Sequence, residues 1–199
     1  FLNSVSEAVE QMRIISGFLG GRSLACPQGM NTRPTSVRVK VSVFSILGEK
    51  VRDAKVLDLF AGSGNLGIEA FSRGASECTF VENNRVPIEV IKKNLTSLGL
   101  NDVSTVVKSE VSAFIKRWAD RGECEKFDLI FVDPPYALDL CKKVLDMIGD
   151  CGLLSRDGVV VAEYAVHFPP CEVHSCLRRM REERYGETLV GFYQTVTGV

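Results

Sequence analysis

The sequence lacks the features of a membrane span, a disulfide framework or a metal centre. No apolar run of about 18 residues occurs in the 199-residue chain, so we expect no membrane span. The seven cysteines are odd in number and form no CxxC pair, which favours a reducing cytoplasm over a disulfide scaffold or a zinc site. No metal is expected. Residues 1–11 lack the regions of a signal peptide, and we expect them to be peripheral to the fold.

Net charge is also nearly absent, at −1, which argues against a general polyanion binder. The distribution is uneven, because residues 12–47 hold five basic residues and no acidic one. These residues are Arg13, Arg22, Arg33, Arg38 and Lys40. A basic segment on a mildly acidic body suggests a contact surface for phosphates, although a solvated face without a partner would have the same composition.

From residue 55 onward, short apolar runs alternate with amphipathic stretches. We predict strands at 56–60, 78–81, 103–107, 127–132 and 159–162, and helices at 65–72, 85–98, 109–118 and 139–148. Such alternation is typical of an α/β fold, a mostly parallel sheet with helices on both faces. Two β-like runs, 171–179 and 188–196, flank a charged stretch with Gly186 and predict an antiparallel hairpin at the end of the sheet.

The N-terminal part does not follow this alternation. A glycine-rich turn between residues 12–15 and 22–25 predicts a small β-hairpin, and residues 35–47 predict a helix with Thr35 as its cap. We therefore divide the chain into a peripheral segment 1–11, an N-terminal extension 12–50 and a main domain 51–199.

A strand, a glycine loop and a helix follow one another at residues 56–67. Gly62, Gly64 and Gly67 have the spacing GxGxxG, which lets the backbone approach a ligand closely. Glu82 ends the next predicted strand, where a carboxylate binds the ribose hydroxyls of an adenosine cofactor. Asp58 would repel a pyrophosphate and attract an ammonium group, which favours S-adenosylmethionine over a dinucleotide.

A second motif, Asp133-Pro134-Pro135-Tyr136, follows the predicted buried strand 127–132. A carboxylate at the carboxyl end of a strand lies where open α/β sheets bind their ligands. The prolines stiffen the turn and remove two N–H donors, so the turn presents mainly acceptors beside an aromatic ring. This arrangement suits a planar substrate that carries an amine.

Together these motifs resemble those of class I S-adenosylmethionine-dependent methyltransferases: DLFAGSGNLGIEAFSRGA at 58–75, FVE at 80–82 and FVDPPY at 131–136. Two further segments, RIISGFLGGR at 13–22 and TRPTSVRVKVSVFSIL at 32–47, resemble the RsmD family, which methylates guanine N2 in bacterial 16S ribosomal RNA. The resemblance covers residues 12–196. It implies a seven-stranded Rossmann-like sheet and an N-terminal extension that holds RNA of the small ribosomal subunit.

The resemblance also implies a role for each matched residue. Asp58, Gly62 and Gly64 would hold the methionine end of the cofactor, Glu82 its ribose, and Asn83 and Glu110 its adenine. Asp133, Pro134 and Tyr136 would form the catalytic motif, and the five basic residues of 12–47 would hold the RNA.

Three other functions remain open at this level. Motifs like residues 133–136 also serve methyltransferases of DNA adenine N6 and of protein glutamine. A non-catalytic module that binds adenosine or RNA is an alternative of another class, and an oxidoreductase with a dinucleotide cofactor is a weaker one. No added DNA-recognition domain is visible in 199 residues, which disfavours a sequence-specific DNA enzyme.

Overall fold

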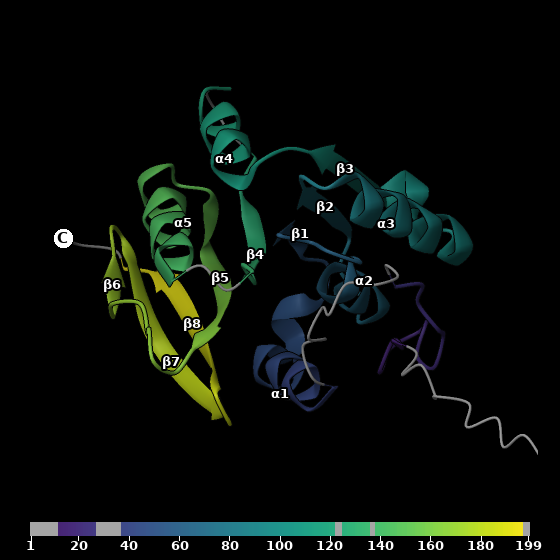
Figure 1. The fold of residues 1–199 in the computed structure, drawn as a ribbon, viewed down its shortest axis with the longest axis horizontal. Helices are drawn as coiled ribbons and strands as arrows, with labels where there is room; N and C mark the ends of the chain where they lie inside the picture. Colours follow the sequence, from purple (N-terminus) through teal and green to yellow (C-terminus); the bar gives the residue numbers. More distant parts are fainter. Residues whose placement is uncertain (1–11, 27–36, 122–124, 136–137, 197–199) are drawn as a thin grey trace, which may run out of the picture.

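A single twisted sheet organises the chain (Figure 1). The computed structural model describes residues 12–26, 37–121, 125–135 and 138–196. Within them the strand order is β3-β2-β1-β4-β5-β8-β7-β6. The strands are β1 (Lys55–Leu59), β2 (Glu77–Glu82), β3 (Ser104–Lys108), β4 (Phe127–Val132), β5 (Leu154–Ala165), β6 (Val173–His174), β7 (Leu177–Tyr185) and β8 (Thr188–Thr195). The helices are α1 (Val37–Leu47), η1 (Gly48–Val51), α2 (Asn65–Ser72), α3 (Arg85–Leu98), η2 (Asn101–Val103), α4 (Val111–Ala119) and α5 (Leu138–Asp150).

The first five strands pair in parallel, and β5 pairs with β8 in antiparallel fashion. In the central strands β1 and β4 almost every residue is buried, because helices cover both faces of a parallel sheet. The predicted α/β class and the mixed sheet with a C-terminal antiparallel part are confirmed.

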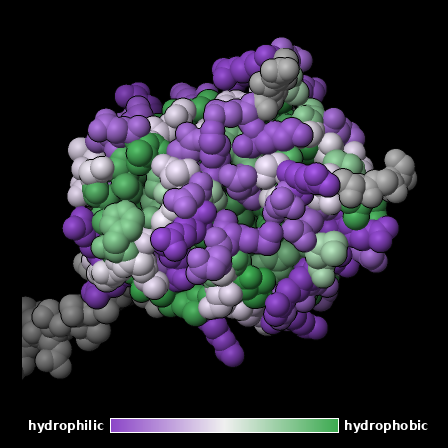
Figure 2. Space-filling view, turned by 180° about the vertical axis from the view of Figure 1, so that it is seen from behind, coloured by the Kyte–Doolittle hydropathy of each residue, from purple (hydrophilic) through white to green (hydrophobic). Residues whose placement is uncertain are grey.

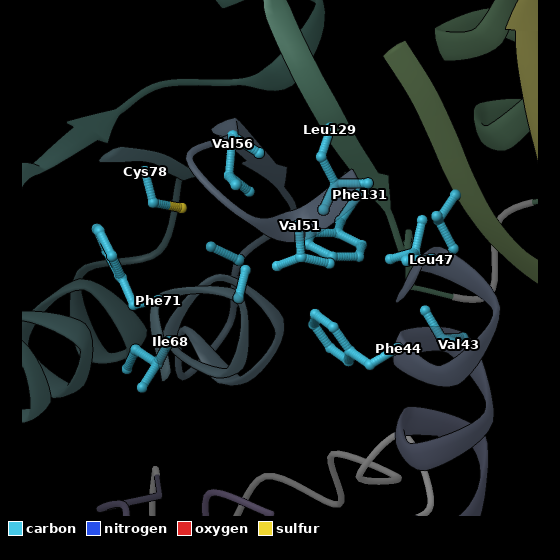
Figure 3. Close-up of a cluster of buried hydrophobic side chains, with 14 of the residues drawn as sticks. Val43, Phe44, Leu47, Val51, Val56, Ile68, Phe71, Cys78, Leu129 and Phe131 are labelled. Carbon is cyan, nitrogen blue, oxygen red and sulfur yellow. The ribbon is translucent and has the colours of Figure 1, made fainter. Parts of the chain in front are cut away.

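Two apolar clusters lie on opposite faces of the sheet. Helices α1, α2 and α3 share one cluster with the side chains of Val56, Phe80 and Phe131, whereas α4 and α5 share the other with Leu57 and Ile130. Figure 3 shows the first cluster, in which Phe44 of α1 lies beside Phe131 of β4 with ring centroids 5.8 Å apart. Alternate residues of one strand therefore point to different helical layers.

The number of strands differs from the predicted seven, since the described residues form eight. The predicted hairpin also has a different division. The charged residues 178–185 belong to strand β7, and Gly186, with φ 62°, lies in the turn that follows it. Strand β7 pairs along its length with the largely buried strand β8, while most of its charged side chains remain exposed. Backbone pairing with β8 therefore extends the strand through the charged stretch that was expected to separate the two β-like runs.

The N-terminal segment, residues 12–26, packs on α2. The predicted hairpin is reduced to one antiparallel bridge between Arg13 and Ser23. Gly17 adopts φ 83°, and a Cβ there would lie 1.6 Å from the carbonyl oxygen of Ser72, so only glycine allows this approach. Ile14, Leu19 and Leu24 enter the same cluster as α1. The predicted cap Thr35 lies outside the described residues.

One face of the molecule is largely hydrophilic (Figure 2). Figure 2 shows this face, on which hydrophilic residues surround small groups of apolar ones. Within the described part of the chain, no helix is both long enough and apolar enough to cross a bilayer.

Candidate active site

The candidate site lies where strands β1 and β4 run side by side in the middle of the sheet. The chain continues from β1 to β2 on one side, and from β4 to β5 on the other. The loops after β1 and β4 therefore diverge, which leaves room for ligands beside the carboxyl ends of these strands. The predicted glycine loop and residues 133–135 both lie at this edge.

The glycine loop leaves β1 through a left-handed backbone conformation. Phe60 has φ 64°, an uncommon value for a bulky residue, and Gly62 and Gly64 have φ 55° and 80°. The nearest atom to a Cβ built on Gly62 is the Phe60 carbonyl oxygen at 3.9 Å, so its outer side is open to a ligand. A Cβ on Gly67 would lie 2.4 Å from the Phe80 ring, which means that this glycine seats α2 against β2. A Cβ on Gly64 would lie 3.2 Å from the Ile68 side chain and 3.3 Å from the Phe80 ring, so Gly64, like Gly67, faces the core, and Gly62 alone of the three is open to a ligand.

Asp58 lies beneath this loop. Its side chain is 2% exposed, and Oδ2 accepts a hydrogen bond of 2.9 Å from the Gly67 N–H. Burial raises the pKa of Asp58 to about 7, with smaller contributions from Asp133 and Glu82, while the Gly67 hydrogen bond opposes the rise. The observed contact of Asp58 is therefore with the first turn of α2, and a positive charge nearby would lower the pKa of its carboxyl.

Glu82, at the end of β2, is hydrogen-bonded to the glycine loop. One carboxylate oxygen accepts from the Gly62 N–H at 3.1 Å, and the other accepts from the N–H groups of Asn83 and Asn84 at 2.9 and 2.8 Å. These bonds hold Glu82 at the end of β2, beside the first glycine. The Asn83 side chain is exposed.

Glu110 follows β3 and caps helix α4. Its Oε2 accepts from the backbone N–H groups of Ser112 and Ala113 at 3.0 and 3.3 Å, and from the Ser112 hydroxyl. The hydrogen bond from Ser112 is the main reason why the pKa of Glu110 is lowered. The capping role was not predicted, and it satisfies backbone donors of α4 that have no partner within the helix.

Asp133 and Pro134 are half-buried at the end of β4. Asp133 lines a small hollow whose other residues come from α1, α2, β4, β5 and β8. They are Val43, Leu66, Phe131, Val132, Val161, Glu163 and Val190. Leu66 belongs to the first turn of α2, directly after the glycine loop, so Asp133 lies close to the cofactor loop. Tyr136, the remaining predicted catalytic residue, lies outside the described residues.

Lys40 is the basic residue for which the structure contradicts the prediction. Its side chain is 2% exposed, and Nζ lies 3.0 Å from Glu69 Oε2, itself fully buried. Nζ also donates to the Arg13 carbonyl oxygen at 3.1 Å and to Asn65 Oδ1 at 2.7 Å. A lysine with these partners is not available to an RNA phosphate; it joins α1, α2 and the N-terminal segment.

Of the other four residues predicted to contact RNA, the structure describes three. Arg13, Arg22 and Arg38 are exposed, as a phosphate contact requires. Arg33 lies outside the described residues.

The N-terminal segment also supports the glycine loop. The buried Asn94 of α3 donates to the carbonyl oxygens of Ser63 and Ala25, both at 3.1 Å, and accepts from the Ala25 N–H at 2.8 Å. The Ser63 hydroxyl donates to the sulfur of Met12 at 3.3 Å. The segment proposed to hold RNA is therefore hydrogen-bonded to the loop proposed to hold the cofactor.

Two carboxylates near the site, Glu69 and Glu163, were not predicted from the sequence. Glu69 accepts from the backbone N–H groups of Ile15 and Ser16 and from Arg73 Nε, besides its ion pair with Lys40. Its position between Ile68 and Ala70 in an apolar helix was the available signal. Glu163 lies two residues after Val161 near the end of β5, the same placement that drew attention to Glu82 and Asp133.

The donors and acceptors present fit S-adenosylmethionine. Gly62 offers an open backbone surface, Glu82 offers a carboxylate at the edge for hydroxyl groups, and the buried carboxyl of Asp58 favours a cation over a pyrophosphate. A Rossmann-like sheet with this loop and an Asp-Pro-Pro turn across the switch point defines an S-adenosylmethionine-dependent methyltransferase.

Comparisons with known proteins narrow this class. A family model described as "Conserved hypothetical protein 95" matches residues 12–194. The chain is 39% identical to "Putative rRNA methyltransferase YlbH" of Bacillus subtilis, over 92% of this chain and 98% of that protein. It is 34% identical to "Ribosomal RNA small subunit methyltransferase D" of Escherichia coli K12, over 92% and 90%. The solved "Putative methyltransferase yhhF from Escherichia coli" superposes with a TM-score of 0.82 at 31% identity, over 93% and 98%.

The chain therefore belongs to the Conserved hypothetical protein 95 family, and the resemblance to RsmD proteins is confirmed. The expected enzyme class and cofactor follow from this membership together with the geometry of the loop.

Proposed function

We propose that this protein transfers a methyl group from S-adenosylmethionine to the exocyclic N2 amine of a guanine in 16S ribosomal RNA. The observation that carries the proposal is the position of Asp133, in one hollow with the first turn of the cofactor helix α2. The names of the relatives, which include a small-subunit ribosomal RNA methyltransferase, support ribosomal RNA as the substrate. The small ribosomal subunit would be the partner, and the cytoplasm the place of action.

Bound S-adenosylmethionine would supply an electrophilic methyl group on a sulfonium centre. Glu82 would hold the ribose hydroxyls, since its oxygens lie at the edge beside Gly62. Asp58 would act on the methionine ammonium through its charge. Gly62 would let the backbone approach the cofactor closely, and Gly64, with φ 80°, would shape the turn that holds the methionine end. Asn83 and Glu110, which follow β2 and β3, would flank the adenine.

The guanine amine is a poor nucleophile, because its lone pair is delocalised into the ring. Asp133 and the Pro134 carbonyl would accept its two N–H groups and thereby localise and orient that lone pair. As the amine nitrogen bonds to the methyl carbon, the carbon–sulfur bond would break and leave a neutral thioether. The methylated amine would become acidic, and Asp133 or water would take its proton. Transfer of this kind needs no covalent enzyme intermediate.

The target base must leave its helix to reach this edge of the sheet, which costs a few kcal/mol. The exposed Arg13, Arg22 and Arg38 would hold the surrounding phosphates. Arg33 would join them, and Tyr136 would stack on the base; both roles rest on the sequence alone.

The experiment that tests the catalytic role is single-turnover methyl transfer by Asp133→Asn. We expect the rate to fall by about a hundredfold or more, with little change in cofactor affinity, because asparagine lacks the charge that stabilises the developing ammonium. Asp102→Asn is the matched control, since Asp102 is exposed in η2 beside strand β3 at the far edge of the sheet. An unchanged rate for Asp133→Asn would remove Asp133 from the mechanism.

The substrate is tested separately. Labelled methyl transfer to small subunits lacking the modification, followed by mapping of the base, should find a guanine carrying methyl on N2. Duplex DNA and a glutamine peptide serve as competing substrates. Preferential labelling of either one would replace the proposed function.

A further inference from the structure

Glu163 lies beside Asp133 on the same face of the sheet. The parallel register pairs Phe131 with Val161 and Val132 with Ala162, so the next positions along the strands are Asp133 and Glu163. Phe131 and Val161 both point into the cluster of α1 and α2. Because side chains alternate along a strand, Asp133 and Glu163 point to that face too, on strands about 4.8 Å apart.

The two carboxylates line one hollow. Its apolar wall includes Val43 of α1 and Val190 of β8, and Leu66 brings in the first turn of α2. Glu163 is half-buried there. Asp133 and Glu163 therefore present adjacent acceptors to a group that enters beside the cofactor loop.

We propose that Glu163 is a specificity-determining residue that accepts the ring N1–H of guanine, next to the 2-amine held by Asp133. This inference rests on the proposed function and names the feature of the base that the site reads. Guanine has a ring N–H donor adjacent to its exocyclic amine, whereas adenine and cytosine have a ring nitrogen acceptor in that position. A glutamine amide has a carbonyl oxygen there.

The pair of carboxylates would thus select guanine among planar amines, a selection that the Asp-Pro-Pro turn alone cannot make. A single acceptor at Asp133 serves any planar amine. A second carboxylate attracts the donor of guanine and repels the lone pair of the other bases, so discrimination comes from both an attractive and a repulsive contact.

The test uses 2-aminopurine, which keeps the 2-amine but has an acceptor at N1. Single-turnover methyl transfer is measured on small subunits reconstituted with RNA that carries guanine or 2-aminopurine at the mapped nucleotide. We expect the native protein to prefer guanine by at least about tenfold. In Glu163→Gln the amide can donate to the N1 acceptor of 2-aminopurine, and we expect the preference to fall by about tenfold.

Glu89→Gln is the matched control, because Glu89 is exposed on α3 and its carboxylate lies 3.9 Å from Lys92. Cofactor affinity and thermal unfolding of each variant identify a general folding defect. A Glu163→Gln protein that loses rate equally on both RNAs would overturn the assignment and leave the proposed function intact. A native protein that methylates neither RNA, while binding the cofactor, would overturn both.

Discussion

Replacing Lys40 by methionine should lower the free energy of unfolding and leave the affinity for RNA unchanged. The Lys40 ammonium is buried against Glu69 and has two further acceptors, the Arg13 carbonyl and Asn65 Oδ1. Burial is the largest influence on its pKa and lowers it, with the Glu69 charge opposing. Arg38 lies two residues earlier on α1 but is exposed, so Arg38→Met is the matched control.

The expected change in the free energy of unfolding depends on which buried group each substitution leaves without a partner. Breaking a buried ion pair by removing one partner costs about 3–5 kcal/mol when the other charge is left uncompensated. Glu69→Ala leaves Lys40 buried with two neutral acceptors and removes the acceptor for Ile15 and Ser16, so we expect about 4 kcal/mol. Lys40→Met leaves Glu69 paired with Arg73, so about 2 kcal/mol is expected. Arg38→Met should change the free energy of unfolding by less than about 0.5 kcal/mol.

Urea denaturation followed by the fluorescence of Trp118, the one tryptophan of the chain, measures these differences. RNA affinity is measured at several salt concentrations. Arg38→Met should lower the salt dependence by about one counterion, and Lys40→Met should leave it unchanged where the protein is folded. A Lys40→Met protein that keeps its stability and loses a counterion would show that Lys40 faces RNA, contrary to this reasoning.

Substitutions at four positions of the glycine loop and the neighbouring elements give the remaining predictions. Gly67→Ala should cost about 1–3 kcal/mol of stability because its Cβ meets the Phe80 ring, whereas Gly62→Ala should mainly weaken cofactor binding, as calorimetry would detect. Asp58 has a raised pKa of about 7, so between about pH 4 and pH 7 the folded state holds a proton that the unfolded chain has released. The free energy of unfolding should therefore fall across this range by at most about 4 kcal/mol, and Asp58→Asn should remove the fall; equal pH profiles for both proteins would contradict the shifted pKa. Glu110→Ala should cost about 1 kcal/mol through loss of the α4 cap, and Glu110→Ser should restore most of it in thermal unfolding.

Much of the fold could be predicted because its signals are local. The bounds of α2, α3 and β4 agree with the prediction, because the hydrophobic pattern that defines each element lies within its own segment. Helix α3 also ends at a local stop signal, the left-handed Gly99. Strand β7 was predicted only in part, since the expected run 171–179 includes its first three residues and stops before its charged remainder. That remainder is held by pairing with β8, a partner that its own charged composition does not reveal.

The site residues also divide into those with a local sequence signal and those that depend on partners distant in the chain. Asp58, Glu82 and Asp133 could be selected because each lies at or near the end of an apolar strand, a pattern visible in a single segment. The apolar helix around Glu69 marks it as unusual, but its role could not be predicted, since its partners come from residues 15, 16, 40 and 73, and no single segment contains them all.

The alternation of strands and helices, the glycine loop and the carboxylates at the strand ends are all visible in the amino-acid sequence. These depend on backbone propensities and on patterns within a few residues. The surroundings of each charge, in contrast, depend on how the folded elements pack. Lys40 and Arg38 are equivalent in charge and lie on one helix, yet α2 and the N-terminal segment bury one and leave the other in water. Because desolvation and pairing depend on neighbours distant in the chain, burial rather than residue type separates the structural lysine from the arginine proposed to hold RNA.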